Sequence, residues 1–198
     1  MDTDRLNKQL AFIIEVDKAK QILRNTILMD ASRQENDAEH MWHMALGILV
    51  FAEYANEKEL DLLKILKMAL IHDIVEIDAG DTYAYGEFNS EVVADCEQKA
   101  ARRIFGLLPE EQAAEFIALW NEFERAETKE ARFAKTLDTF MPVLHNYHTQ
   151  GKQWQKNNVT SDRVLARCSA RMAPGSEKLW EYVQELLDDA VKKGYLKP

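Results

Sequence analysis

Apolar residues recur along this chain at three- and four-residue intervals, the spacing of one face of a helix. Residues 3–24 show the pattern at Leu6, Leu10, Ile13, Ile14, Val16 and Ile22. The same periodicity predicts further helices over 37–56, 59–78, 91–106, 110–125, 128–149, 161–170 and 176–193. No stretch alternates apolar and polar residues as a half-buried strand would, so the pattern predicts an all-α fold.

Polar and turn-forming residues separate the predicted helices, with loops expected over 25–36, 79–90 and 150–160. Asn36 and Glu39 have the spacing of a capping box, which places the start of the second helix. Asn89 or Ser90 can cap the fourth helix. Pro142 lies inside the sixth helix and is expected to kink it.

Two of the predicted helices have distinctive apolar patterns. The segment 37–56 is apolar on nearly all sides, which is typical of a helix buried in the core. The segment 176–193 carries an amphipathic stripe at Leu179, Trp180, Val183, Leu186, Leu187 and Val191. Such a stripe either packs on the core or covers a dimer interface, and the sequence leaves both open.

Composition limits the class of protein. A chain of 198 residues, 46% of them apolar and with only 7 Gly and 4 Pro, suits one helical domain. The net charge of −9 argues against binding to a nucleic acid polymer or an anionic membrane. Cys96 and Cys168 lack the spacing of a zinc knuckle. With no signal peptide in "MDTDRLNKQL" and no membrane-spanning run, we expect a cytoplasmic protein.

The stretch "ALIHDIVEIDAGD" at 69–81 places charged groups in an apolar helix. If 59–78 is one helix turning about 100° per residue, His72, Asp73 and Glu76 share the inward arc. The opposite, solvent-facing arc carries Lys64, Lys67 and Asp78. Buried charges are costly unless they are paired or bind a metal. A structural hydrogen-bond network is one explanation, but imidazole beside carboxylates favours a divalent metal site.

One helix cannot supply a whole metal site, and the chain has only five His. His40, in the first turn of the buried second helix, is the candidate that joins His72 and Asp73. His43 could share the site or be an ordinary packed imidazole. The two late histidines, His145 and His148, are expected to face solvent.

Three motifs together resemble a known family. "EH" at 39–40, "HD" at 72–73 and the Asp of "FAKTLD" at 133–138 resemble the HD-domain metal-dependent phosphohydrolases, and most closely the small 5′-deoxynucleotidase-like branch. The matching blocks are "RQENDAEHMWHMAL" and "LIHDIVEIDAGDT". The resemblance implies metal ligands at His40, His72, Asp73 and Asp138. Without the resemblance, the helical periodicity shows Asp138 only as a carboxylate at the border of an apolar stripe.

The resemblance also implies the other site residues. Glu76 would handle the attacking water, and Asp81 would relay a proton to the leaving sugar oxygen. A phosphate-binding Arg is expected in the segment that contains Arg24 and Arg33. The chain has "RNT" at 24–26, where better-known members follow the Arg with Trp and Pro, so strict selectivity for deoxynucleotides is not implied.

We therefore expect a single HD domain over 1–198, with a core over about 5–150 and helices at 161–193 packed on it or on a dimer partner. The expected activity is hydrolysis of deoxyribonucleoside 5′-monophosphates with one divalent metal ion (Mn, Co, Fe, Zn or Mg), because no His lies between 73 and 145 to hold a second one. Small phosphorylated substrates and a homodimer follow from the resemblance. The alternatives are hydrolysis of another small phosphate ester, or a non-catalytic helical dimer that binds a metal and a nucleotide.

Overall fold

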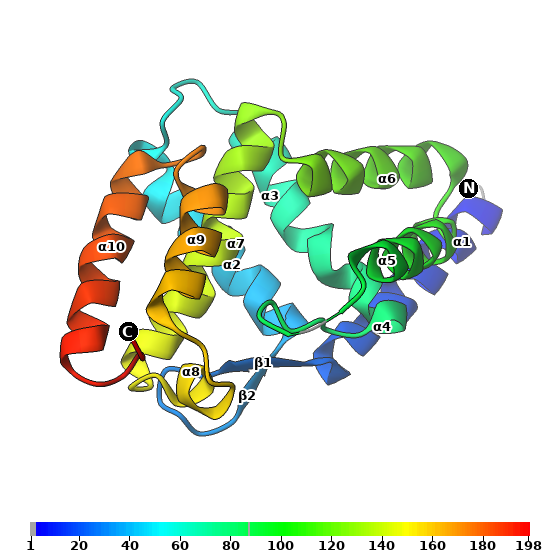
Figure 1. Ribbon diagram of the computed structural model, residues 1–198. Helices are drawn as coiled ribbons and strands as arrows, with labels where there is room; N and C mark the ends of the chain where they lie inside the picture. Colours follow the sequence, from blue (N-terminus) through cyan, green and yellow to red (C-terminus); the bar gives the residue numbers. More distant parts are fainter. Residues whose placement is uncertain (1–2, 87) are drawn as a thin grey trace.

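Helix α7 runs through the middle of the protein and contacts α2, α3, α6, α9 and α10 (Figure 1). A computed structural model describes residues 3–86 and 88–198, so Glu87 in the expected loop at 79–90 lies outside the described residues. The helices are α1 (Thr3–Val16), α2 (Asp37–Phe51), α3 (Leu62–Ile71), α4 (Glu76–Ala79), α5 (Ser90–Phe105), α6 (Glu110–Arg125), α7 (Lys129–His148), α8 (Lys152–Lys156), α9 (Ser161–Met172) and α10 (Glu177–Lys192). Tighter turns, η1 (Asp17–Gln21), η2 (Ala52–Tyr54) and η3 (His72–Val75), extend three of them. The predicted all-α architecture is confirmed.

The segment expected to be a loop at 25–36 instead contains a small sheet. Strand β1 (Leu23–Ile27) pairs antiparallel with β2 (Gln34–Asn36), with Leu23 opposite Asn36 and Ile27 opposite Gln34. The strands are short and rich in polar residues, so the sequence has no apolar alternation that would reveal them. The second strand leads directly into the first turn of α2 (Figure 1).

The third predicted helix does not run straight over 59–78. It begins at Leu62, where Asp61 accepts a hydrogen bond from the backbone N–H of Lys64, and it changes to a tighter turn at His72. The backbone becomes α-helical again at Glu76. This short helix, α4, is capped by Gly80, whose φ of 77° suits glycine. The break lies at the residues expected to carry chemistry.

Two expectations about apolar faces need correction. Helix α2 is not buried on all sides, because Trp42, Leu46, Leu49 and Val50 are exposed. The apolar residues predicted to face the core from α1 are also mostly exposed, and Phe12 is buried instead.

The remaining differences are smaller. The C-terminal stripe packs within the chain, because α10 contacts α7 and α9 and buries Leu179, Val183, Leu186 and Leu187. The expected loop at 150–160 contains α8, and α7 continues through Pro142. None of the helices in the described residues combines the length and apolarity that a membrane span requires.

Candidate metal centre and pocket

The start of α2 is fixed by a capping box that the sequence predicted. The backbone N–H of Glu39 donates to the Asn36 side chain at 3.0 Å, and the Glu39 carboxylate accepts from the backbone N–H of Asn36 at 3.2 Å. The cap sets the helix register, and His40 follows one residue later with its side chain fully buried. The first helical turn thus brings an imidazole to the centre of the protein.

His72 lies at the break between α3 and η3 and is held by backbone groups. Its Nδ1 lies 2.9 Å from the carbonyl oxygen of Ala69, which can only accept a hydrogen bond. Nδ1 therefore carries a proton, and Nε2 faces the carboxylates of Asp73 and Asp138. Burial lowers the pKa of His72, but Asp73 and Asp138 outweigh it and raise the pKa to about 10.

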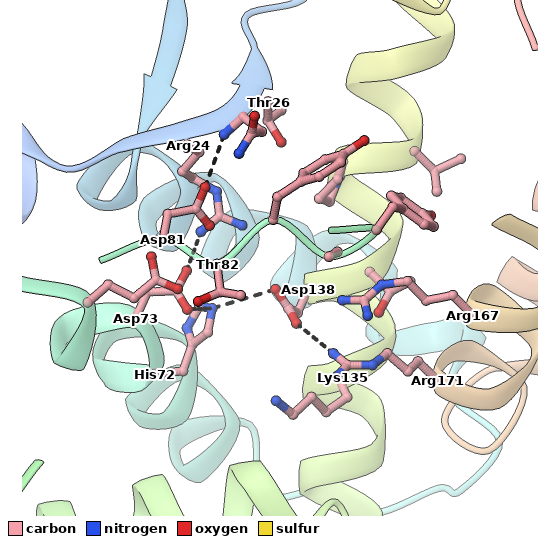
Figure 2. Close-up of a pocket in the computed structure, with 18 of the residues that line it drawn as sticks. Arg24, Thr26, His72, Asp73, Asp81, Thr82, Lys135, Asp138, Arg167 and Arg171 are labelled. Atoms are coloured by element: carbon pink, nitrogen blue, oxygen red, sulfur yellow. Dashed lines mark hydrogen bonds and ion pairs between the residues drawn. The ribbon is translucent and has the colours of Figure 1, made fainter. Parts of the chain in front are cut away.

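The donor atoms of the four predicted metal ligands converge in one place, and Figure 2 shows three of these ligands, His72, Asp73 and Asp138. The Nε2 atom of His40 is 3.2 Å from Asp138 Oδ1 and 3.7 Å from Asp73 Oδ2. The Nε2 atom of His72 is 3.2 Å from Asp73 Oδ1 and 3.6 Å from Asp138 Oδ1. Ligand atoms held at about 2.0–2.2 Å from a tetrahedral ion lie roughly 3.3–3.6 Å apart. Within residues 3–86 and 88–198, His72 Nε2 is also buried without a hydrogen-bond partner, so these residues fit a divalent cation.

Further carboxylates lie beside this group. Oxygen atoms of Asp37, Asp73 and Glu76 lie within 4.8 Å of one another. Burial, followed by the repulsion of Asp73, raises the pKa of Asp37 to about 7 and the pKa of Glu76 well above its usual value. Asp81 lies at the same pocket and accepts a hydrogen bond from the backbone N–H of Asn25 at 3.1 Å.

The two candidate phosphate-binding arginines lie in different environments. The side chain of Arg24 is 11% exposed, and its Nη1 atom is 2.5 Å from Asp73 Oδ2 and 3.6 Å from Asp37 Oδ1. Arg33 is exposed and binds both carboxylate oxygens of Glu39 at 2.6 and 2.8 Å. Arg24 lines the pocket with the metal-binding candidates, whereas Arg33 is not among the lining residues.

The pocket has a cationic wall that sequence reasoning did not identify. Arg167 and Arg171 extend from α9 toward Asp138, and Lys135 reaches in from α7 (Figure 2). Arg171 Nη1 is 3.8 Å from Asp138 Oδ2. Burial and the charge of Arg171 lower the pKa of Arg167. Two arginines four residues apart are common on solvated helix faces, so their spacing carries no signal of a site.

The pocket between these walls has the size and chemistry of a small-ligand site. Its volume is about 280 Å³, and Tyr83, Tyr85 and Phe88 of the loop after α4 provide aromatic surface. In Figure 2, Arg24 lies with Asp81, Asp73 and His72 on one side, and Arg167 and Arg171 lie on the other. A polar, multiply charged ligand with an aromatic part suits such a pocket.

The remaining histidines lie away from this pocket. His148 is exposed, as expected. His145 was expected to face solvent, but it is buried with its Nδ1 atom 2.9 Å from the carbonyl oxygen of Ile27. The strand β1, which the sequence did not reveal, covers it. His43 is half-buried beside His145.

Comparison with known proteins places the chain among related sequences. The sequence model of the family described as HD domain matches residues 16–180. A 5′-deoxynucleotidase HDDC2 from Dictyostelium discoideum is 33% identical over 63% of this chain and 67% of its own length. The human 5′-deoxynucleotidase HDDC2 is 30% identical over 68% of this chain and 65% of its own length. The chain thus spans about two thirds of these curated relatives.

A solved structure is similar over nearly the whole chain. It is described as a predicted metal-dependent phosphohydrolase from Magnetospirillum magnetotacticum, and it is 48% identical to this chain with a TM-score of 0.94. The similarity covers 98% of this chain and 97% of that one.

Proposed function

The chain belongs to the HD domain family and is a metal-dependent phosphohydrolase, and from this premise we propose that it hydrolyses deoxyribonucleoside 5′-monophosphates to a deoxynucleoside and phosphate. The observation that carries the proposal is the pocket itself, which joins a four-donor metal cluster to a cationic wall and an aromatic surface. The names of the curated relatives support the nucleotide class of substrate.

We assign one divalent cation, of the group Mn, Co, Fe, Zn and Mg, to His40, His72, Asp73 and Asp138. When bound, such an ion polarises a phosphoryl oxygen and lowers the pKa of a water molecule. Arg24 is surrounded by carboxylates, and its ion pair with Asp73 orients the Asp73 carboxylate as a metal ligand.

Glu76 is assigned as the base that takes the proton from the attacking water. Burial raises its pKa well above the usual range, which brings the group closer to the pKa that suits proton transfer at neutral pH. As the new P–O bond forms and the bond between phosphorus and the sugar oxygen breaks, that oxygen needs a proton. Asp81, on the same pocket wall, is assigned to deliver it.

The phosphate is held by Arg167 and Arg171 in this proposal. Arg24 has several carboxylate neighbours. Among the described residues, the two arginines of α9 face the pocket with one carboxylate contact, which joins Arg171 to Asp138 at 3.8 Å. An anionic ligand would offset their mutual repulsion. Arg33, engaged with Glu39 outside the pocket, is left out of the proposed site.

The first test is phosphate release from a panel of deoxy- and ribonucleoside 5′-monophosphates by metal-stripped protein supplied with Mn²⁺, Co²⁺, Mg²⁺ or Zn²⁺. We expect turnover of the deoxy series, abolished in Asp73→Ala. Equal turnover of both series would broaden the substrate class to other small phosphate esters. No release from any nucleotide by protein that retains metal would contradict the proposal and favour the non-catalytic binding alternative.

The homodimer and the cytoplasmic location stay predictions. An interface would have to use a surface other than the α10 stripe, which is packed within the chain. The exposed apolar residues of α2 are the candidate.

A further inference from the structure

A second group of side chains has the chemistry and spacing to bind a metal ion. Glu35 of β2, His43 of α2 and His145 of α7 each place one donor atom within 4.8 Å of the other two. The distance from His43 Nδ1 to His145 Nε2 is 3.5 Å, and that from His145 Nε2 to Glu35 Oε1 is 3.7 Å. None of the three lines the pocket, so the proposed hydrolysis does not use them.

The ring of His145 is already oriented as a ligand. Its Nδ1 atom lies 2.9 Å from the Ile27 carbonyl, which only accepts, so the proton is on Nδ1. In the neutral ring Nε2 is then the unprotonated nitrogen, and it lies 3.5 Å from His43 Nδ1 and 3.7 Å from Glu35 Oε1. A backbone carbonyl that fixes the tautomer in this way is common for histidines that bind metals. Burial lowers the pKa of both His43 and His145, which favours the neutral, ligating form.

The carboxylate of Glu35 lacks a close partner among the nitrogens around it. Glu35 is 2% exposed, yet its oxygens are 3.7 Å from Arg24 Nε, 3.8 Å from His40 Nδ1 and 3.7 Å from His145 Nε2. All three distances are too long for a hydrogen bond. A hydrogen bond from His43 to His145 would pair the two imidazoles with each other and leave Glu35 Oε1 at 3.7 Å from His145 Nε2.

We propose that Glu35, His43 and His145 bind a second divalent transition metal ion, of the zinc class. The separations of 3.5 and 3.7 Å are close to the roughly 3.3–3.6 Å between ligand atoms of a tetrahedral ion. Two imidazoles and one carboxylate are a ligand set typical of zinc. A water molecule would be needed as the fourth ligand of such an ion, and His43 is half-buried. This site goes beyond the proposed function and does not depend on turnover.

The test measures zinc per chain. Full-length protein is stripped with a chelator, dialysed against buffered Zn²⁺ and analysed for bound metal, with circular dichroism to verify the fold. We expect two zinc ions in the wild type and one in His43→Gln and His145→Gln. His148→Gln is the matched control, because His148 is exposed on the same helix as His145, and it should retain two.

One zinc ion in the wild type, or two in His43→Gln, would overturn the proposal. If buried His145→Gln does not fold, His43→Gln decides alone, because His43 is only half-buried. Asp138→Asn separates the two sites, since it should lose the ion of the pocket and keep the ion at His43. A failure of the nucleotidase assay would leave these metal counts unchanged.

Discussion

Glu76 combines a buried carboxyl group with a position on the pocket wall beside Asp73. Replacing Glu76 with Gln keeps the shape but removes the base, so we expect turnover to fall by about 10²–10⁴-fold. Metal content should stay the same, because Glu76 is not among the proposed ligands. Phosphate release and elemental analysis on the same sample measure both. Unchanged turnover would show that another group takes the proton.

Arg171 is the arginine of the cationic wall that reaches nearest to the proposed metal centre. Arg171→Gln removes a charge-assisted contact to phosphate worth about 1.5–3 kcal/mol, so kcat/KM should fall by roughly 10- to 100-fold. Arg33→Gln is the control, and its kcat/KM should stay within a few-fold of the wild type. The opposite ranking of the two variants would place the phosphate near Arg33 instead.

The candidate residues differ in how far the sequence could indicate them. His72, Asp73 and His40 stand out because charged groups in apolar helices are costly. Asp138 became a candidate only through the family resemblance, since its position at the edge of an apolar stripe is ordinary. Arg167 and Arg171 were missed because arginines at this spacing most often lie on a solvated face.

At the scale of the elements, the capping box of α2 couples local sequence to the site. Asn36→Ala removes the side chain that accepts from the Glu39 N–H, and we expect a loss of about 0.5–2 kcal/mol in the free energy of unfolding. The first turn that carries His40 should fray, so metal affinity should fall as well. Chemical denaturation and metal titration measure the two effects. Asn36→Asp retains a cap and should restore both.

The break in the third helix shows why the bounds of the helices were harder to predict than the residues of the site. No Gly or Pro interrupts residues 62–79, so the periodicity suggested one continuous helix. In the structure, His72 ends α3, and its carbonyl accepts a hydrogen bond from the indole of Trp120 at 3.1 Å. This tertiary contact comes from a residue 48 positions away, which local patterns cannot show.

For the whole molecule, the all-α fold and the family were predictable because helical periodicity covers most of the chain and the motifs lie far apart in it. The exposed face of α2 was not predictable, because its sequence is apolar on nearly all sides. Only the arrangement of the neighbouring helices determines which side is left uncovered.

Metal binding should stabilise the whole fold. Asp37, Asp73 and Glu76 crowd together beside Arg24, so a cation relieves their repulsion in the folded state. At a metal concentration about 100 times Kd, linkage adds about 2.7 kcal/mol, which corresponds to a rise of several degrees in Tm for a chain of this size. Thermal unfolding with a chelator and with Mn²⁺ measures the shift. Asp138→Asn should show a smaller rise.

The carboxylate of Glu35 faces both metal-binding groups, with Oε1 toward His145 and Oε2 toward His40. An ion held by Oε1 would fix the direction of Oε2 behind the imidazole of His40. The two occupancies would then be thermodynamically linked. Linkage is reciprocal, so each ion would change the binding affinity of the other by the same factor.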